Sequence, residues 1–463
     1  MNTLTDSVSP DIQSDLSARS TRAVWHPCTQ MKCLDKSPPI AIESGSGPWL
    51  TDTSGRRYFD ACSSWWVNLF GHANPFINEA LRKQLDTLEH TLLAGCTHAP
   101  AVELAERLSD LTGNHLGHAF YASDGASAVE IALKMSFHYW RNAGKAEKRS
   151  FVCLRQSYHG ESIGALSVTD VEIFRDAYAP LLMRTHRVMS PDTRLARVGE
   201  RADDVVSRAL QDVEELFEHQ SEGIAAIIVE PMIQCATGMA MYPASYLTEL
   251  RRLCDRYSVH LIADEIAVGF GRTGKFFAFE HAISEVAAEN WPDFMCLSKG
   301  LTGGYLPLSV VLVRGGIYDG FLDDDVGRGF LHSHSYTGNP LACRAALATL
   351  DLFERDNVLA ENSVRAQWLG SALEPVARAS WARHTRQLGM VWACDVADCV
   401  AGERFAERLM IAARAHEVLL RPIGNTVYLM PPYIFDEPMA AWLGERVGAA
   451  IDEALAGGIG HAT

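Results

Sequence analysis

Residues 293–304, with the sequence Asp293-Phe-Met-Cys-Leu-Ser-Lys299-Gly-Leu-Thr-Gly-Gly304, combine an apolar run, a lysine and a glycine-rich turn. The run has the length and composition of a buried strand, which places Lys299 at the end of that strand. An amine in such a place costs free energy unless it is paired or has a chemical function. We therefore expect Lys299 to belong to a functional site.

A second apolar run, Ile262-Ala-Asp264, ends in a carboxylate upstream of Lys299. A lysine can form a Schiff base with an aldehyde, and an aspartate can hold a proton on a pyridine nitrogen. These are the two groups that a pyridoxal phosphate enzyme needs. The alternatives are a lysine at the surface or in an ion pair, and an aspartate that caps a helix or pairs with Arg272. The glycine-rich turn after Lys299 disfavours the first of these alternatives.

Strands alternate with helices through the middle of the chain. An apolar strand over residues 224–229 ends at Glu230, a helix follows over about 244–257, and a strand over 259–263 ends at Asp264. This alternation predicts an α/β fold with a mostly parallel, doubly wound sheet. Ligands of such sheets bind beyond the carboxyl ends of the strands. Glu230, Asp264 and Lys299 all fall at such ends, which predicts that they share one site.

A glycine turn joins a predicted strand over residues 118–122 to a predicted helix over 128–140. The first N–H groups of a helix are unpaired and the helix dipole is positive there, so this geometry can bind a phosphate group. Many strand–helix turns carry glycine and bind nothing, so this signal is weak when taken alone.

The length of the chain, 463 residues, predicts a large and a small domain. We expect residues 1–20 to be a mobile polar tail and 21–75 to be an N-terminal segment, with an antiparallel meander, that joins the small domain. Residues 76–344 are predicted to form the large cofactor-binding domain. Residues 345–463 are predicted to form a smaller C-terminal α+β domain, with strands over 386–394 and 426–429.

Composition excludes several classes of function. The formal net charge of -16 argues against a nucleic-acid partner, because phosphate backbones favour clustered Lys and Arg. No apolar run approaches membrane-spanning length and no signal pattern opens the chain, which predicts a cytoplasmic protein. The 11 cysteines form no CxxC pair, so we expect reduced thiols and no metal site. His332 and His334 alternate, but no further ligands stand at a suitable spacing.

An ordered set of motifs resembles the class III (omega) aminotransferases of fold type I, over about residues 25–433. The set consists of Ile262-Ala-Asp-Glu-Ile-Ala-Val-Gly-Phe-Gly-Arg-Thr-Gly274, Lys299 with its glycine turn, and Thr337-Gly-Asn-Pro340. Further motifs resemble the biotin-pathway subgroup of this family: Trp25-His-Pro27, Ser63-Ser-Trp-Trp66, Tyr158-His-Gly160, Leu420-Arg-Pro422 and Tyr428-Leu-Met-Pro-Pro-Tyr433.

The resemblance implies pyridoxal 5'-phosphate as the cofactor and a homodimer with shared active sites. Lys299 would be the catalytic residue, and Asp264 would pair with the pyridine nitrogen. The remaining cofactor contacts that the resemblance implies are Gly125, Ala126, Tyr158, His334 and Ser335. Ala126 stands where the family often has serine, which leaves a backbone N–H group as the contact there. Ser335 would reach the phosphate from the other subunit.

The resemblance also implies a set of substrate contacts: Cys28, Trp65, Tyr158, Lys299, Ser333 and Arg421. Trp65 would line the substrate pocket, and Arg421 would grip a carboxylate with two hydrogen bonds. Cys28 departs from the subgroup, which commonly has a tyrosine at this position that touches both substrates. A cysteine stacks on adenine less well, so this position weakens the prediction of the amino donor. The resemblance suggests no exact roles for Glu161 and Glu230.

The function expected from the resemblance is transfer of an amino group to 8-amino-7-oxononanoate, giving 7,8-diaminononanoate, with S-adenosylmethionine as donor. Three alternatives stay open. The chain could be an omega-amino acid or diamine:pyruvate aminotransferase, or it could perform the same transfer with lysine as donor. It could also be a non-catalytic ligand sensor, but such proteins carry a DNA-binding domain, for which the residues before Trp25 leave no room.

Overall fold

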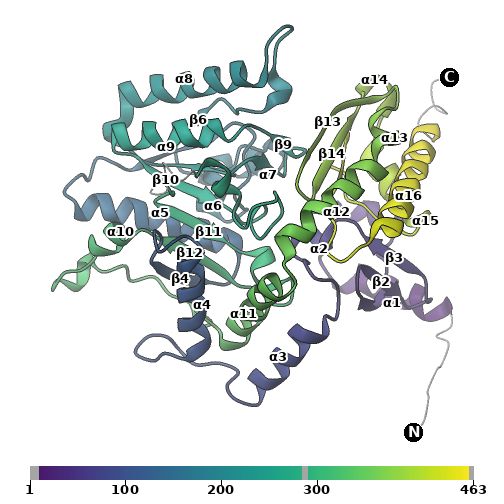
Figure 1. The fold of residues 1–463 in the computed structure, drawn as a ribbon, viewed down its shortest axis with the longest axis horizontal. Helices are drawn as coiled ribbons and strands as arrows, with labels where there is room; N and C mark the ends of the chain where they lie inside the picture. The colour runs from purple at the N-terminus through teal and green to yellow at the C-terminus, as the bar shows by residue number, and fades with distance from the viewer. Residues whose placement is uncertain (1–9, 284–289, 458–463) are drawn as a thin grey trace.

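The computed structural model describes residues 10–283 and 290–457 of the chain (Figure 1). At its centre is a sheet of seven strands. Their order across the sheet is β4 (His118–Ala122), β12 (Ser309–Val313), β11 (Phe294–Leu297), β10 (His260–Asp264), β7 (Ile224–Val229), β5 (Ser150–Leu154) and β6 (Thr185–Val188). The strands from β11 to β6 are parallel, and β12 runs antiparallel to both of its neighbours. The predicted doubly wound, mostly parallel sheet is therefore confirmed.

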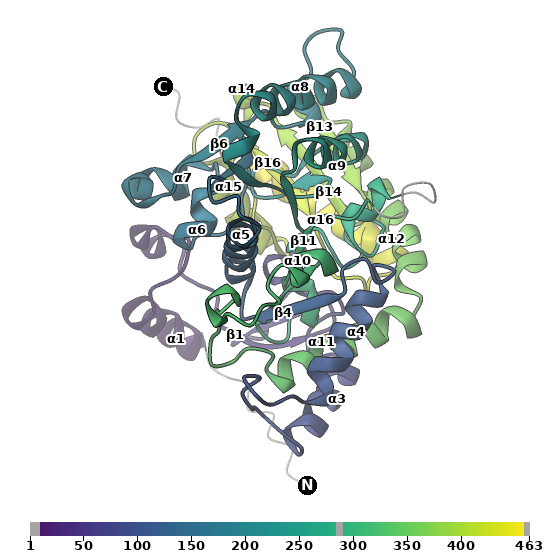
Figure 2. The same cartoon turned by 90° about the vertical axis from the view of Figure 1, so that its left-hand side faces the viewer.

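Helices cover both faces of this sheet, which explains why its strands read as continuous apolar runs. Alternate residues of β5 point to opposite faces: Phe151 and Cys153 pack with α5 (Gly125–Asn142), whereas Val152 and Leu154 belong to the core under α8 (Ala202–Gln220) and α9 (Ser245–Tyr257). Figure 2 shows α5 end-on, with α8 and α9 lying together above the sheet.

The remaining helices of this part follow the sequence signals. α3 (Pro75–Leu85) begins where Asn74 Oδ1 accepts a hydrogen bond from Phe76 N at 3.0 Å, as expected for an Asn-Pro helix start. The other elements are α4 (Ala99–Asp110), α6 (Ile163–Ser167), α7 (Glu172–Arg175), α10 (Gly315–Asp319), α11 (Pro340–Arg355), β8 (Ile233–Gln234) and β9 (Ala240–Met241). Short 3₁₀ turns are η1 (Met31–Asp35), η2 (Asp176–Leu181), η3 (Thr193–Leu195), η4 (Ser221–Gly223), η5 (Ala278–Ala282), η7 (Lys299–Thr302) and η8 (Val326–Arg328). The domain boundary predicted between residues 344 and 345 falls inside α11.

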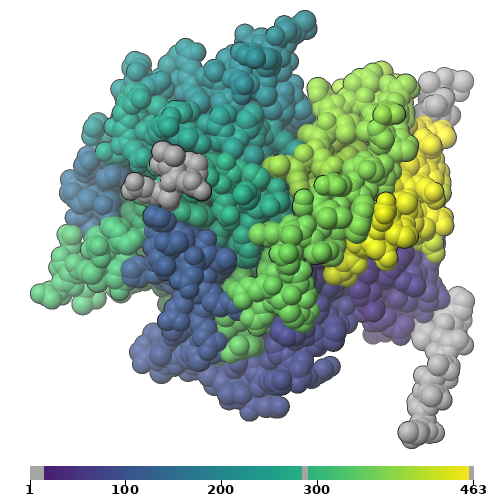
Figure 3. Space-filling view, in the orientation of Figure 1, coloured from purple at the N-terminus to yellow at the C-terminus, as the bar shows by residue number. Residues whose placement is uncertain are grey.

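A second group of elements lies beside the large sheet (Figures 1 and 3). It contains a three-stranded antiparallel sheet in the order β13 (Ala382–Leu388), β14 (Val391–Val396) and β16 (Thr426–Leu429). Its helices are α12 (Val358–Ala372), α13 (Glu374–Ala377), α14 (Asp398–Ala401), α15 (Phe405–Ala415) and α16 (Glu437–Ala456). The single strand predicted over residues 386–394 is wrong: a tight turn divides this segment into two strands, with Gly389 at φ +56°.

The N-terminal segment packs with the C-terminal part through a shared sheet. The meander β1 (Ile42–Ser46), β2 (Trp49–Asp52) and β3 (Arg57–Asp60) forms as predicted, and β15 (Val418–Leu419) pairs in parallel with β3. The predicted tail differs. Its first nine residues lie outside the described ranges, and residues 10–20 belong to helix α1 (Pro10–Ala23) rather than to an irregular tail. No helix within residues 10–283 and 290–457 is long and apolar enough to cross a membrane.

Candidate active site

A cavity of about 250 Å³ opens at the carboxyl ends of β7, β10 and β11. Its wall contains six of the residues predicted from the sequence: Gly125, Ala126, Tyr158, Glu230, Asp264 and Lys299. The residues that complete the wall are Trp66, Asp124, His159, Gly160, Glu161, Ile266, Ala267 and Val268. The strand ends therefore meet at one place, as the topology requires.

Asp264, the last residue of β10, pairs with a histidine. Its Oδ2 lies 2.7 Å from His159 Nδ1, its Oδ1 accepts a hydrogen bond from Ile266 N at 3.1 Å, and both side chains are buried. His159 Nε2 has no hydrogen-bond partner among the described residues. The sequence analysis did not single out His159, although it quoted the motif Tyr158-His-Gly160. The His159 imidazole thus holds one carboxylate oxygen of Asp264, and the backbone N–H group of Ile266 holds the other.

Lys299 follows β11 and takes a left-handed backbone conformation, with φ +43°. Its Nζ atom lies 4.9 Å from the centre of the Trp66 ring. Burial lowers the pKa of Lys299, and the negative charge of the nearby Asp264 carboxylate opposes this shift. The lowered pKa makes the neutral, nucleophilic amine more accessible than in an exposed lysine.

Glu230 ties the loop after β5 to the end of β7. Its Oε1 accepts a hydrogen bond from Tyr158 N and its Oε2 accepts one from Cys235 N, each at 3.0 Å. Burial raises the pKa of this carboxyl group to about 7, while His159 and the two N–H groups act in the opposite direction. Glu230 therefore fixes the position of Tyr158 through the backbone.

The start of α5 faces the cavity and is packed closely by small residues. A Cβ atom on Gly160 would come within 2.7 Å of Ala126 Cβ, and one on Gly125 would come within 2.9 Å of Ile266. Asp124 caps the helix by accepting hydrogen bonds from Ser127 N at 2.9 Å and Ser127 Oγ at 2.8 Å. The Ser127 hydroxyl is thus engaged with Asp124, and the backbone of the first helical turn remains for an anion.

Tyr158 presents its ring at the cavity wall. Its hydroxyl donates a hydrogen bond to Glu161 Oε1 at 2.9 Å, and its ring packs edge-on against Phe174 with the ring centres 5.6 Å apart. Burial and the charge of Glu161 raise the pKa of Tyr158. The phenol is therefore neutral at physiological pH, and its ring orientation is held from two sides.

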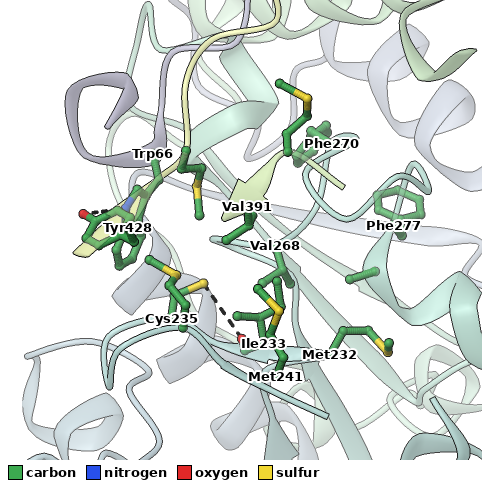
Figure 4. Packing of buried hydrophobic residues seen from close by; sticks show 14 of the residues in the cluster. Trp66, Met232, Ile233, Cys235, Met241, Val268, Phe270, Phe277, Val391 and Tyr428 are labelled. Carbon is green, nitrogen blue, oxygen red and sulfur yellow. Dashed lines mark hydrogen bonds between the residues drawn. The ribbon is translucent and has the colours of Figure 1, made fainter. Parts of the chain in front are cut away.

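The two neighbouring tryptophans occupy different places. Trp66 is 5% exposed, lines the cavity and donates a hydrogen bond from Nε1 to Tyr428 Oη at 3.0 Å (Figure 4). Trp65 is 41% exposed and stacks under Arg421, whose guanidinium carbon lies 4.2 Å from the ring centre. The sequence analysis singled out Trp65, and the structure adds Trp66 as the tryptophan beside Lys299. The doubled Trp-Trp in the sequence was the available signal.

The other predicted residues lie outside the cavity wall. His334 approaches Ser123, just before α5, with its ring nitrogens 3.4 and 3.5 Å from Ser123 Oγ. Ser333 and Ser335 are exposed on the neighbouring loop. Cys28 is exposed in the N-terminal segment and lies close enough to Tyr158 to contribute to the raised pKa of that phenol. The structure thus brings six predicted residues together in the cavity wall and leaves Cys28, Ser333 and Ser335 exposed.

Arg272 does not pair with Asp264, the alternative considered above. Within the described residues, its guanidinium donates hydrogen bonds to three carbonyl oxygens: Pro431 O at 2.9 Å, Asn68 O at 3.1 Å and Trp66 O at 3.2 Å. No group of three or more His, Cys, Asp or Glu side chains suited to a metal ion occurs in the described ranges.

The cavity suits pyridoxal phosphate in each of its parts. A half-buried amine and a buried carboxylate stand at the strand ends, an aromatic ring stands at the wall, and Gly125 and Gly160 allow a helix start to pack closely at the same wall. Asp264 suits the ring nitrogen of this cofactor, the start of α5 suits its phosphate, and Lys299 suits its aldehyde.

Comparison with known proteins agrees with this geometry. A family model described as aminotransferase class-III matches residues 32–451. The chain is 43% identical over 431 residues to the adenosylmethionine-8-amino-7-oxononanoate aminotransferase of Helicobacter pylori, covering 92% of this chain and 94% of that one. The corresponding enzyme of Geobacter sulfurreducens is 39% identical over 421 residues, covering 89% of this chain and 91% of that one.

Solved structures show the same fold. The crystal structure of adenosylmethionine-8-amino-7-oxononanoate aminotransferase from Methanocaldococcus jannaschii has a TM-score of 0.87 at 35% identity, covering 95% of this chain and 99% of that one. An (S)-enantioselective omega-transaminase from Thermomicrobium roseum has a TM-score of 0.89 at 29% identity, covering 96% and 99%. The two solved structures match this chain about equally well in shape, so only the sequence identity distinguishes between the two kinds of aminotransferase. The chain belongs to the class III aminotransferase family and is a pyridoxal phosphate-dependent enzyme.

Proposed function

We propose that this aminotransferase converts 8-amino-7-oxononanoate to 7,8-diaminononanoate, with S-adenosylmethionine as the amino donor. The observation that carries the proposal is the identity of 35–43% with relatives that all bear the name adenosylmethionine-8-amino-7-oxononanoate aminotransferase. Their similarity extends over about nine-tenths of this chain, and the family model spans residues 32–451, which contain the cavity wall and Arg421.

Lys299 and Asp264 carry the reaction in this proposal. When bound, pyridoxal phosphate accepts the amino group of one substrate, delocalises the electron pair released at carbon and passes the amino group to the second substrate. The Lys299 amine binds the cofactor and then moves a proton at the reacting carbon, a task that suits its lowered pKa. The Asp264 carboxylate, oriented by His159, keeps a proton on the pyridine nitrogen.

Gly125 and Ala126, whose backbone at the start of α5 lines the cavity, would hold the phosphate group through their N–H groups. Tyr158, in the cavity wall, would contact the cofactor ring. His334 and Ser335 complete the cofactor contacts, and Ser335 does so in a second copy of the chain. Its exposure on a loop beside the cavity supports this assignment, because an exposed hydroxyl is free to meet another subunit. We propose accordingly a homodimer with shared active sites.

The keto acid binds between the cofactor and the outer loops. Arg421 holds its carboxylate, and Trp65, against which Arg421 stacks, forms the wall beside it. Ser333 and Cys28 contact the substrates from the exposed loops, Tyr158 from the cavity wall, and Lys299 at the reacting carbon. The stacking of Arg421 on an aromatic face supports its role, because a stacked guanidinium keeps its donors directed outward.

The thiols and charge of the chain suit the cytoplasm, where we place the enzyme. The 11 cysteines are all unpaired, which agrees with a reducing compartment. The partners are small molecules, with no nucleic acid and no membrane among them.

An omega-amino acid or diamine:pyruvate aminotransferase is the alternative that the omega-transaminase fold match favours. The experiment supplies purified enzyme, loaded with cofactor, with 8-amino-7-oxononanoate and either S-adenosylmethionine or lysine, and detects the diamine by mass spectrometry. Diamine formed with S-adenosylmethionine supports the proposal, and diamine formed with lysine alone changes the donor. Rapid reaction of β-alanine or putrescine with pyruvate, without diamine formation from either donor, would overturn it.

A further inference from the structure

Four consecutive residues between β3 and α3 adopt the left-handed backbone conformation. Ser63, Ser64, Trp65 and Trp66, which form the single turn α2 (Ser63–Trp66), have φ angles of 49°, 48°, 70° and 73°. None of them is glycine, and this conformation costs an L-residue about 1–2 kcal/mol. Such backbone persists only where the surrounding structure forces it, and it concentrates at functional sites.

Asp60, the last residue of β3, holds this turn from one side. Its Oδ1 accepts a hydrogen bond from Ser64 N at 2.9 Å and its Oδ2 accepts one from Ser64 Oγ at 2.7 Å. His72 Nε2 lies 3.0 Å from the same Oδ2. Asp60 is 1% exposed, so these bonds are shielded from water. Burial alone would raise its pKa, but His72 and Ser64 hold the pKa of Asp60 below its ordinary value, so the carboxylate stays charged.

Two other segments hold the turn from the opposite side. Ser63 Oγ donates a hydrogen bond to Met430 O at 2.7 Å, and the buried Arg272 donates one to Trp66 O at 3.2 Å. The turn is thus attached to β3, to the chain after β16 and to the loop after β10. This number of attachments exceeds what a surface connection needs to remain folded.

The turn presents two neighbouring tryptophans to two different cations. Trp65 lies under Arg421 at 4.2 Å, and Trp66 lies under Lys299 at 4.9 Å. These are the two cations to which the proposed function gives the carboxylate and the reacting carbon of the keto acid. The strained turn therefore sets the separation of the two places where one substrate must be held.

We propose that Asp60 is a positioning residue, which fixes the left-handed turn and thereby sets Trp65 against Arg421 and Trp66 against Lys299. It does so through Ser64 and touches neither substrate nor cofactor. The proposal rests on the proposed function for the roles of Trp65 and Arg421. Misplacing a substrate-holding group by about 1 Å can cost about 100-fold in rate, so a small distortion of the turn has a measurable effect.

Asp52 provides a matched control within the same meander. It is also 1% exposed, and its Oδ1 accepts hydrogen bonds from Ser54 N at 2.9 Å and Ser54 Oγ at 2.7 Å. The turn that it holds joins β2 to β3 and carries none of the predicted site residues. Asp52 also accepts hydrogen bonds from Tyr58 Oη at 2.9 Å and Arg56 N at 3.0 Å. Asp60→Asn and Asp52→Asn therefore each remove a carboxylate charge that holds a turn through a serine two or four residues on, and only the turn held by Asp60 carries the tryptophans.

The experiment compares both variants as holoenzymes and in the cofactor-free form. We expect Asp60→Asn to raise KM for 8-amino-7-oxononanoate by about 10- to 100-fold, and to alter the tryptophan bands of the near-ultraviolet circular dichroism without cofactor. Asp52→Asn should leave both unchanged while lowering the unfolding midpoint to a similar degree. Equal KM values in the two variants, or unaltered tryptophan bands in Asp60→Asn, would overturn the inference.

A second variant covers the case in which Asp60→Asn fails to fold. Ser64→Ala removes one hydrogen bond, worth about 0.5–1.5 kcal/mol, and keeps the carboxylate, so KM should rise about two- to tenfold. In a Trp65→Ala background this rise should become smaller, because the turn then has no ring to hold against Arg421 and positions only Trp66. A rise of undiminished size there rejects the inference. If Trp65→Ala and Arg421→Ala themselves leave KM unchanged, the proposed substrate roles fail instead.

Discussion

The floor of the cavity and the outer loops differ in how the fold holds them. Glu230, Asp264 and Lys299 form the floor and stand at or just after the ends of strands β7, β10 and β11. Glu230 and Asp264 are buried, and Lys299 is half-buried. Cys28, Ser333 and Ser335, by contrast, are exposed on segments without regular structure. The difference indicates that the sheet fixes the chemistry shared by the family, and it supports the proposal that the exposed loops carry the choice of substrate.

Replacing Lys299 tests the floor most directly. We expect Lys299→Ala to lose turnover by more than about a thousandfold, the scale seen when a reacting group is removed, and to lose the visible absorbance of the lysine-bound cofactor. Absorbance spectra and steady-state kinetics measure both effects. The control is Lys148→Ala, which removes a buried lysine that donates hydrogen bonds to Ser221 O at 2.7 Å and Ile224 O at 3.0 Å. Turnover retained by Lys299→Ala would contradict the assignment.

Asp264→Asn should lower kcat by about 100- to 1000-fold, because the neutral amide no longer stabilises a proton on the pyridine nitrogen. Asp293→Asn is the matched variant: Asp293 is also buried on this sheet, but its Oδ2 pairs with Arg251 Nη1 at 2.7 Å outside the cavity wall. That variant should lose stability and keep its kcat per folded molecule. Similar kcat values in the two variants would contradict the role assigned to Asp264.

Arg421→Ala tests the outer loops. Loss of a charged hydrogen bond, worth about 1.5–3 kcal/mol, should raise KM for the keto acid by about 10- to 100-fold and leave the reaction with the amino donor nearly unchanged. The chain offers a second arginine stacked on a tryptophan as control: Arg446 lies 5.5 Å from the ring centre of Trp442. Arg446→Ala should have no effect on either KM value. An increase in both KM values of Arg421→Ala would mean that the arginine serves the two substrates equally.

The opposite end of β10 gives a pH effect on stability. Burial lowers the pKa of His260 from 6.5 to about 4, so the unfolded chain binds one more proton than the folded chain between these values. Stability is therefore lost as pH falls from 6.5 to 4, by about 1.4 kcal/mol per pH unit. His260→Phe should remove this slope in urea unfolding measured at pH 7 and pH 5. An unchanged slope would show that other groups cause the acid sensitivity.

The smallest expected effect concerns the second subunit. Ser335→Ala should weaken cofactor binding by about two- to tenfold, as expected for one hydrogen bond. Fluorescence titration of the cofactor-free protein with pyridoxal phosphate measures it. Ser333→Ala is the companion variant and should change KM for the keto acid while leaving cofactor affinity unchanged. If Ser335→Ala binds the cofactor normally, the shared-site arrangement loses its main residue.

The residues at the strand ends could be predicted from the sequence, because a polar residue after an apolar run falls at the carboxyl end of a parallel strand, where ligands bind. Lys299 and Asp264 were found this way, and the resemblance added Tyr158. His159 was missed because a histidine beside a glycine gives no sign of its partner 105 residues away. Trp66 was missed because which of two adjacent rings faces inward depends on φ angles that non-glycine residues seldom adopt. Helix α1 was missed because a polar segment lacks the apolar period that predicts a helix.

Gly389 limits how this architecture can vary. A Cβ atom there would come within 2.5 Å of the Thr273 carbonyl carbon and 2.6 Å of Arg272 O, so the hairpin of β13 and β14 touches the loop after β10 backbone to backbone. Met390 N also donates a hydrogen bond to Arg272 O at 2.8 Å. Two parts of the chain are thus joined at a point that accepts no side chain. Directed evolution of substrate range should therefore yield changes in the exposed loops and none at this joint.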